Sequence, residues 1–313
     1  MTAMNAPIPS QALASKSLNA YEMSEHPDHP RLLHLKLNPE AVQGFLDDVS
    51  DIDVQNLEYV PFMRFHMART LVKHMGVDFA EKLNAIVKDR NHGGFTLGLQ
   101  GLTTDSAEYV KFGTAIGHIL GPGNHDSMSG TFYARFLVKH TDASDSYLRQ
   151  AYRLFTMHTD GTFVTEATDW LLMMKFDEKN AVGGESRFLH LDDWSECQRF
   201  AMDPLGSKPL LYKAPGSKNV NERVERPVFF HGEFGLSMSF IDQFVQPAND
   251  AEAGYLQALS ESMEASSGTK TVRLPIGDLV VLNNYFYVHG RAPFEKNENL
   301  HRELMRQRGT FAR

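Results

Sequence analysis

The segment GTFYARFLVK, residues 130–139, marks the point at which the sequence changes from helical to β-strand patterning. Its apolar residues recur at every second position, namely Phe132, Ala134, Phe136 and Val138. Such alternation is typical of a strand, because successive side chains point to opposite faces. Further strand-like segments follow at residues 170–176, 186–191, 236–241, 271–274, 279–282, 286–289 and 303–311. The C-terminal part of the chain is therefore predicted to be mainly β.

Helical patterning dominates the residues before this segment. Residues 33–37 alternate as a short strand, and Asn38 with the proline after it forms the N-cap and first-position pair that opens a helix. Apolar residues recur every three or four positions over residues 62–87, with a break near Gly76, and over residues 107–120. The first third of the chain is therefore expected to be mostly helical.

The remaining predicted elements point to an antiparallel arrangement. Helices are expected at residues 192–202 and 251–263, and a long loop at residues 204–227, which contain several Lys, Pro and Gly residues. Strands that do not alternate regularly with helices favour an antiparallel barrel or double sheet over a parallel sheet. The predicted fold class is mainly β with flanking helices.

Composition and charge exclude several classes of protein. The chain has 313 residues, of which 42% are hydrophobic and 22% charged, a globular composition. A formal net charge of -8 argues against bulk attraction to nucleic acid or to an anionic membrane surface. No apolar run in the sequence approaches the ~20 residues that span a bilayer. The single cysteine, Cys197, excludes an internal disulfide and multi-cysteine metal sites, and fits a reducing compartment.

The first thirty residues form a separate region of the sequence. They are rich in Ala, Ser and Pro, and they lack the basic start and the apolar core of a signal peptide. We expect residues 1–30 to be a flexible tail of a cytoplasmic protein.

Histidines and carboxylates spaced two positions apart are candidate metal ligands. On a strand, such a pair points to one face and supplies two ligands at once. The pattern occurs at residues 26–28, 158–160, 190–192 and 231–233. We expect the first to lie in the tail, Asp192 to cap a helix and the last to form a hairpin turn. His158 and Asp160 follow an apolar run and lead into Gly161, so they are best placed to bind a metal.

A third ligand has to come from a distant strand. His289 ends the apolar segment at residues 285–288, and it lies 131 positions after His158, which suits a strand that returns across a barrel. Two histidines and one carboxylate form the facial triad that leaves three positions open on Fe(II). His158, Asp160 and His289 are therefore the predicted metal ligands and catalytic centre.

Seven separated phrases carry a resemblance to a known family. They are residues 128–130 (MSG), 133–136 (YARF), 145–150 (DSYLRQ), 158–162 (HTDGT), 190–194 (HLDDW), 241–247 (IDQFVQP) and 302–309 (RELMRQRG). In this order they resemble the Fe(II)/2-oxoglutarate-dependent oxygenases, and within them the CsiD family of glutarate 2-hydroxylases. The resemblance runs from about residue 30 to the C-terminus.

The resemblance implies a fold and an activity. The fold would be a double-stranded β-helix, the cupin-like jelly roll, over about residues 130–313, within a single domain at residues 31–313. The activity would use Fe(II), with 2-oxoglutarate and O2 as co-substrates, to hydroxylate a small dicarboxylate. Glutarate would become L-2-hydroxyglutarate in lysine degradation, with release of succinate and CO2. The family also implies a homo-oligomer, namely a tetramer.

The same resemblance points to residues that bind 2-oxoglutarate. Its C5 carboxylate needs a fixed cation, and the planar fork of arginine makes two parallel bonds to such a group. Arg302, Arg306 and Arg308 share one face of the last predicted strand by their even spacing. We assign Arg306 mainly to 2-oxoglutarate and Arg308 to glutarate, or the reverse. Ser186, in a Gly-Gly-x-Ser turn, is expected to hydrogen-bond the C5 carboxylate.

Three other functions remain open at this stage. The scaffold tolerates many substrates, so another carboxylic or sulfonic acid is one alternative to glutarate. A sensor that binds 2-oxoglutarate or metal without turnover is a second. A zinc hydrolase is a third, because His/His/Asp also binds Zn(II), although the arginine strand has no role there.

Overall fold

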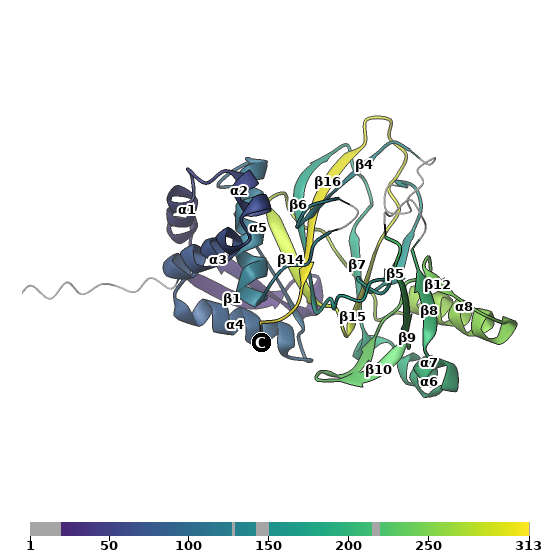
Figure 1. Cartoon of the computed structure of the whole chain (residues 1–313). Coiled ribbons are helices and arrows are strands. Elements are labelled where there is room, and N and C mark those ends of the chain that lie inside the picture. Colours follow the sequence, from purple (N-terminus) through teal and green to yellow (C-terminus); the bar gives the residue numbers. More distant parts are fainter. Residues whose placement is uncertain (1–19, 127–128, 142–149, 215–219, 313) are drawn as a thin grey trace, which may run out of the picture.

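The computed structural model describes residues 20–126, 129–141, 150–214 and 220–312 (Figure 1). In chain order the elements are β1 (Tyr21–His26), β2 (His29–Leu37), α1 (Pro39–Asp48), α2 (Val54–Tyr59), α3 (Phe62–Met75), α4 (Val77–Lys88), β3 (Gly94–Gly98), α5 (Ser106–Leu120), β4 (Ala134–Lys139), β5 (Phe155–His158), β6 (Trp170–Lys179), β7 (Ser186–His190), η2 (Leu191–Asp193), α6 (Cys197–Met202), α7 (Pro204–Ser207), β8 (Leu210–Lys213), β9 (Arg223–Arg226), β10 (Phe229–Gly232), β11 (Gly235–Met238), β12 (Val245–Gln246), α8 (Asp250–Glu264), β13 (Lys270–Val272), β14 (Asp278–Asn283), β15 (Tyr287–Arg291) and β16 (His301–Gly309).

Two sheets form the β core. The larger has seven strands in the order β1-β2-β3-β14-β6-β16-β4, antiparallel except for the β2–β3 pair, and the smaller has the order β13-β7-β15-β5. In Figure 1, β6, β16 and β4 lie opposite β7, β15 and β5. Neighbouring strands come from distant parts of the chain, as in a double-stranded β-helix. The predicted jelly-roll fold class is confirmed.

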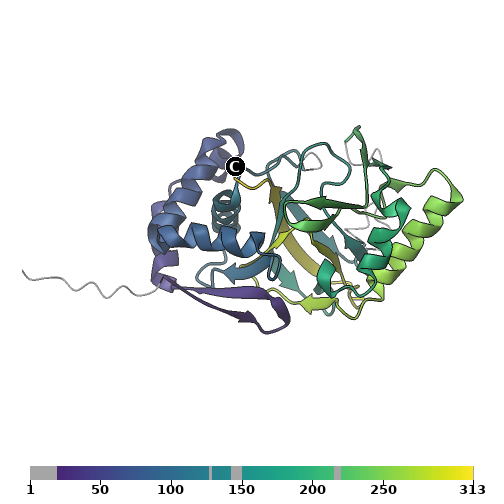
Figure 2. The same cartoon turned by 90° about the horizontal axis from the view of Figure 1, so that it is seen from below.

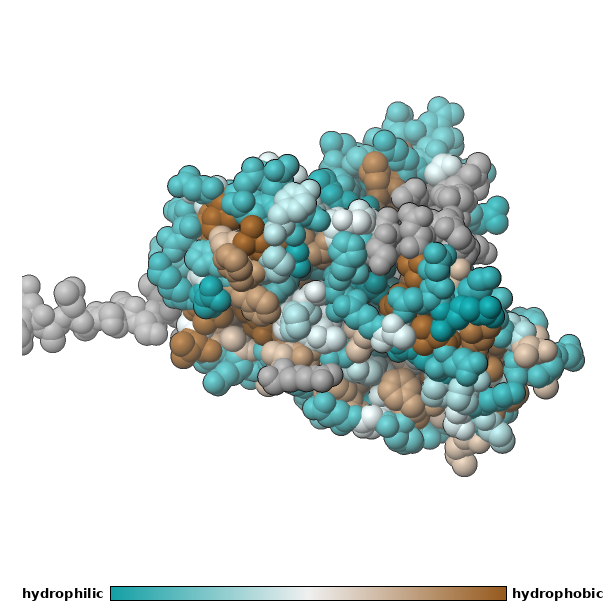
Figure 3. Space-filling model, viewed as in Figure 1, coloured by the Kyte–Doolittle hydropathy of each residue, from teal (hydrophilic) through white to brown (hydrophobic). Residues whose placement is uncertain are grey.

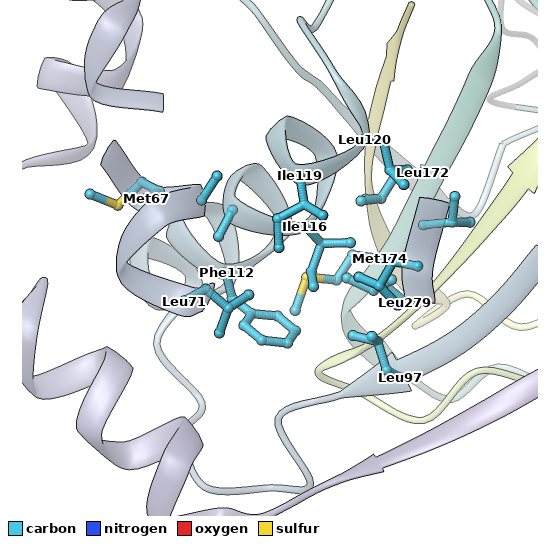
Figure 4. Packing of buried hydrophobic residues seen from close by; sticks show 14 of the residues in the cluster. Met67, Leu71, Leu97, Phe112, Ile116, Ile119, Leu120, Leu172, Met174 and Leu279 are labelled. Carbon is cyan, nitrogen blue, oxygen red and sulfur yellow. The ribbon is translucent and has the colours of Figure 1, made fainter. Parts of the chain in front are cut away.

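The helices of the first third cover the outer face of the seven-stranded sheet (Figures 1 and 2). The predicted start at Asn38 is confirmed, since its side chain accepts a 2.8 Å hydrogen bond from the backbone N of Glu40. Gly76, at a φ of 95°, separates α3 from α4 where the sequence predicts a break. Figure 4 shows Phe112 and Ile116 of α5 between side chains of α3 on one side and of β6 and β14 on the other. This layer therefore supports the sheet from outside.

Strand β14 takes part in two hydrophobic clusters. Leu279 and Val281 point into the cluster that contains the helices, and Val280 and Leu282 point into the cluster that contains β7 and β15. All four side chains are buried. We propose that the described residues form a single domain, because neither cluster is complete without this strand.

The prediction of a tail up to residue 30 is wrong for residues 21–30. Tyr21–His26 forms β1, which pairs antiparallel with β2 and thereby lengthens the predicted strand into a hairpin. The four central residues of β1 are exposed, so the strand depends on backbone hydrogen bonds to β2. A strand with mostly exposed side chains shows no apolar alternation, so the sequence pattern does not predict it. Residues 1–19 lie outside the described residues.

Three further expectations are corrected by the structure. The predicted loop at residues 204–227 contains α7, β8 and β9. The mostly helical first third also contains β3, whose five residues are all buried, so this strand shows no alternation. His190, not Asp192, provides the cap at η2, since its Nδ1 accepts a 3.0 Å bond from the backbone N of Asp192. Asp192 instead forms an ion pair with Arg90 at 2.7 Å.

The surface is mainly hydrophilic on the face shown in Figure 3, with apolar areas over the helical side. Aromatic side chains exposed on α2 and α3 include Tyr59, Phe62 and Phe65. Among the helices in the described ranges, none combines the length and the apolar character that a membrane span requires.

Asp278, the first residue of β14, is a half-buried carboxyl group that lowers stability at neutral pH. It lies over Gly98 of β3, and burial raises its pKa from 3.8 to about 6. Below about pH 3 the group is mostly protonated in both folded and unfolded chains. As the pH rises to about 6 the unfolded chain loses this proton first, so up to ~3 kcal/mol of stability is lost over that range.

Asp278→Asn is therefore expected to increase the free energy of unfolding by about 1–3 kcal/mol near pH 8, with little effect near pH 3. Urea unfolding of both proteins across this pH range measures the difference. Asp51→Asn, at an exposed aspartate, is the matched control. A gain that does not depend on pH would contradict the explanation by burial of charge.

Candidate active site

Three predicted metal ligands come together between the two sheets. His158 ends β5 and lies directly opposite His289 of β15, because the two strands are antiparallel neighbours. Their ring centroids are 4.2 Å apart. One ligand atom each from His158, Asp160 and His289 lies within 4.8 Å of the others. Residues 131 positions apart in the sequence thus form one cluster, as the sequence predicts.

Neighbouring groups fix the orientation of these side chains. Nδ1 of His158 lies 2.8 Å from the backbone O of Thr156, so it donates there and leaves Nε2 for a metal. The side chain of Asn284 accepts from the backbone N of Asp160 at 2.9 Å and donates to the backbone O of Asp160 at 3.0 Å. Gly161, at a φ of 73°, then turns the chain away where a side chain would collide with Thr168. These contacts fix the backbone of Asp160 and thereby limit where its carboxylate can lie.

The protonation states of the cluster suit a divalent metal. Burial lowers the pKa of His289 to about 3, so its imidazole is neutral at pH 7. Burial alone would raise the pKa of Asp160, but the nearby Arg306 guanidinium and both histidines outweigh it and hold the pKa below its usual range. The site therefore offers a neutral imidazole from His289 and an ionised carboxylate from Asp160, two donors of the kind that a metal needs.

Close approach of β5 and β15 depends on Gly290. A Cβ atom at this position would lie 2.4 Å from the backbone O of Phe155. The register of the two strands is irregular between His289 and Arg291, which is where Gly290 lies. The glycine thus permits the strand contact that brings the histidines together.

The three predicted arginines of β16 all line the same pocket, but they differ in their partners. Arg306 donates to Asp126 at 2.6 Å and to Asp160 at 3.1 Å. Arg302 has an ion pair with Glu178 at 3.8 Å and, within the described ranges, no hydrogen bond from its guanidinium. Arg308 is 6% exposed, and in the same part of the chain its guanidinium has no hydrogen-bond partner. Arg308, and Arg302 apart from its 3.8 Å ion pair, are thus left with hydrogen-bond donors that a ligand could satisfy.

Arg302 belongs to a cluster at one end of this pocket. Burial lowers its pKa to about 10, against the opposing charge of Glu178. Its guanidinium stacks over the ring of Phe294, as does that of Arg291. Ser186, the predicted hydroxyl donor, is buried in the same pocket and pairs with Arg291 across β7 and β15. Arg302, Arg291 and Ser186 therefore lie at the same end of the site.

The sequence prediction omits three residues of the site. Arg291 follows His289 by two positions, so the period-two rule that selects the ligands could also have found it. Asp126 lies just before the MSG phrase, which extends into residues outside the described ranges, as does most of the DSYLRQ phrase. Asn284 has no local signal, since its role depends on a contact 124 positions away in the sequence.

A jelly roll whose pocket holds two histidines and one carboxylate defines the class of non-haem iron oxygenases. The sequence also matches the model of the CsiD family over residues 21–311. The chain belongs to the CsiD family.

Named relatives agree with this family assignment. The chain is 41% identical to the glutarate 2-hydroxylase of Klebsiella pneumoniae (strain 342), over 100% of this chain and 97% of that protein. It is 44% identical to the glutarate 2-hydroxylase of Pseudomonas putida, over 93% of this chain and 91% of that protein.

Solved structures share the fold at much lower identity. An asparagine oxygenase in complex with Fe(II), 2S,3S-3-hydroxyasparagine and succinate has a TM-score of 0.72 at 14% identity, covering 88% of this chain and 93% of its own. The non-heme iron oxygenase OrfP in complex with Fe and alpha-ketoglutaric acid has a TM-score of 0.66 at 17% identity, covering 88% and 94%. At these identities the likeness is one of fold alone.

Proposed function

We propose that this protein is an Fe(II)- and 2-oxoglutarate-dependent dioxygenase that hydroxylates glutarate at C2 to L-2-hydroxyglutarate, with release of succinate and CO2. Relatives named glutarate 2-hydroxylase at 41% and 44% identity support this proposal. The observation that carries it is the charge of the pocket around the His158, Asp160 and His289 cluster.

The described pocket lining is matched to two dicarboxylates. Its charged side chains are four arginines and two aspartates, so it carries a net charge of two positive when the histidines are neutral. A bound divalent metal would raise this to four positive. One molecule each of 2-oxoglutarate and glutarate, both dianions, would balance the charge of the lining, without counting Glu178, which pairs with Arg302 at 3.8 Å but is not a lining residue. A zwitterionic amino-acid substrate would leave positive charge buried and unbalanced, which is costly.

The donor set fits Fe(II). His158, Asp160 and His289 would hold it on one side, because their ligand atoms converge. The protonation states of His289 and Asp160 are also those of metal ligands. Thr156 and Asn284 keep His158 and Asp160 in place. When bound, Fe(II) would bind the 2-oxo acid end of 2-oxoglutarate and activate O2.

Arg302 and Ser186 are the groups that we propose for the C5 carboxylate of 2-oxoglutarate. Arg302 is buried and, within the described residues, its guanidinium has no hydrogen bond, so a carboxylate would satisfy it. This proposal departs from the sequence assignment of 2-oxoglutarate mainly to Arg306, because Arg306 already holds two carboxylates. The sequence assignment itself remains an untested prediction.

Arg308 is the group that we propose for the glutarate carboxylate. It lies six residues from Arg302 on β16, about 20 Å along an extended strand, so the two arginines serve different ligands. Apolar side chains between them, including Leu304 and Met173, would contact the methylene groups of the substrate. In this proposal the two arginines bind the carboxylates of the two ligands, and the apolar side chains between them orient the methylene groups of the substrate.

The cellular setting is also part of the proposal. We propose a cytoplasmic homotetramer that acts in lysine degradation, supported by the family resemblance and by a single buried cysteine. Light scattering after gel filtration measures the oligomeric state. A monomer at micromolar concentration would contradict the tetramer.

A scan of small acids tests the proposed activity. The iron-loaded protein is incubated with 2-oxoglutarate and, in separate reactions, glutarate, adipate, taurine and asparagine, and substrate-dependent succinate release is measured. We expect the highest rate with glutarate, together with a product of the mass of hydroxyglutarate. Turnover of another acid with none of glutarate would favour the alternative oxygenase. Tight 2-oxoglutarate binding without turnover of any acid would favour the sensor.

A further inference from the structure

Asp126 lies beside the proposed metal site but is not one of the three predicted ligands. It is 4% exposed and lines the pocket. Its Oδ2 accepts a 2.6 Å hydrogen bond from Nη2 of Arg306, and its Oδ1 accepts a 3.0 Å bond from the backbone N of Ser129. Neither contact is part of the backbone pairing between the strands of the two sheets.

Arg306 is shared between two carboxylates. Its Nη2 donates to Asp126, and its Nη1 donates to Oδ1 and Oδ2 of Asp160 at 3.1 and 3.3 Å. Only one nitrogen of the guanidinium therefore faces Asp160. Without Asp126, both nitrogens would be free to form a bidentate pair with Asp160, the strongest arrangement for these two groups. Both oxygens of Asp160 already accept a long bond from Nη1, and a second nitrogen would shorten these contacts and compete more strongly with a metal for the carboxylate.

The position of Asp126 is fixed from outside the jelly roll. Its backbone N donates to the backbone O of Thr131 at 2.7 Å, and its backbone O accepts from Gly130 at 2.8 Å. The hydroxyl of Thr131 donates in turn to Glu58 of α2. Backbone bonds to Gly130 and Thr131, and the link from Thr131 to α2, thus hold Asp126 where its carboxylate meets Arg306.

We propose that Asp126 is a positioning residue for the metal site: it holds Arg306 by one nitrogen and thereby keeps the Asp160 carboxylate available to the metal. This inference rests on the proposed function, since it presumes that the triad binds a divalent ion. Asp126 acts through Arg306 and touches neither substrate nor metal.

The test is the affinity of the metal-free protein for Mn(II), measured from the EPR signal of the free ion without 2-oxoglutarate or substrate. Asp126→Asn is expected to weaken Mn(II) binding about 10- to 100-fold, the usual range for groups that orient metal ligands. The titrations are made at a temperature well below the thermal unfolding of both metal-free proteins, because loss of a buried ion pair also lowers stability. Asp126→Ser, which can still accept from Ser129, is a second variant and should lose the same affinity.

Two comparisons separate positioning from a merely structural role. In an Arg306→Met background, Asp126→Asn is expected to change the Mn(II) Kd less than about threefold, because the residue through which it acts is gone. Asp169→Asn is the matched control, since Asp169 binds Tyr285 and the backbone N of Phe311 and contacts no pocket arginine in the described structure. It should lower thermal stability without changing Mn(II) binding.

The outcomes distinguish this inference from the proposed function. Wild-type affinity in both Asp126 variants would overturn the inference, and so would an equal loss in the presence and absence of Arg306. If the wild type and His289→Ala bind Mn(II) equally weakly, the metal site itself is refuted and the proposed function fails with it.

Discussion

His289→Ala is expected to lower succinate release by at least about a thousand-fold, equivalent to ~4 kcal/mol of transition-state stabilisation. The change removes one of three ligand atoms that converge within 4.8 Å, and the two that remain cannot fix the metal in one geometry. Anaerobic Mn(II) titration of the same variant should show a parallel loss of metal affinity. Turnover with glutarate and 2-oxoglutarate, measured with excess Fe(II), checks the rate.

His190→Ala is the matched control for this variant. His190 is also a fully buried histidine, and it pairs with Tyr287 of the same strand that carries His289. Its ring contacts Phe286 and Tyr287, and it does not line the pocket. Its replacement should reduce stability and leave metal affinity within a few-fold of the wild type. If both variants retain turnover, the triad is not the catalytic centre.

Arg302→Met is expected to raise the KM for 2-oxoglutarate about 100-fold, and Arg308→Met to raise the KM for glutarate by a similar factor. Each change removes a buried guanidinium, which in our proposal pairs with one carboxylate in a site from which water is excluded. Two-substrate kinetics, supported by equilibrium binding of 2-oxoglutarate to the metal-loaded protein without O2, separates the two effects.

Lysine variants sharpen the same test. Arg302→Lys keeps the charge but loses the planar fork, so it should restore only part of the affinity for 2-oxoglutarate. If Arg302→Met raised the KM for glutarate alone, Arg302 would be the residue that binds glutarate and the two proposed assignments would be exchanged. Loss of 2-oxoglutarate affinity in Arg306→Met alone would support the assignment made from the sequence.

The sequence predicts those parts of the fold and site that depend on local pattern. Alternation locates β4, an apolar run locates β6, and helical spacing locates α3 and α5. The spacing of two positions brings His158 and Asp160 to one place. The exposed strand β1 has no such pattern, because its stability comes from backbone pairing with β2. Strand β3 also lacks alternation, because the side chains on both of its faces are buried.

The sequence could not predict which carboxylates pair with each arginine, and the reason is different. Even spacing places Arg302, Arg306 and Arg308 on one face, but it does not show that Asp126 and Asp160 occupy only Arg306. That difference arises where a loop tied to α2 meets β16, more than 170 positions later in the chain. Hydrogen bonds between such distant segments exist only in the folded structure.

The place of β16 has a consequence for biosynthesis. This strand is the last of the described elements, yet it lies inside the larger sheet, where it pairs with β6 on one side and β4 on the other. Among the described strands, β4 pairs with no other. A nascent chain therefore has two unpaired strand edges, on β4 and β6, until residues 301–309 leave the ribosome, and such edges promote aggregation. Chains truncated before residue 301 should accordingly be recovered as insoluble material, well before any question of catalysis arises.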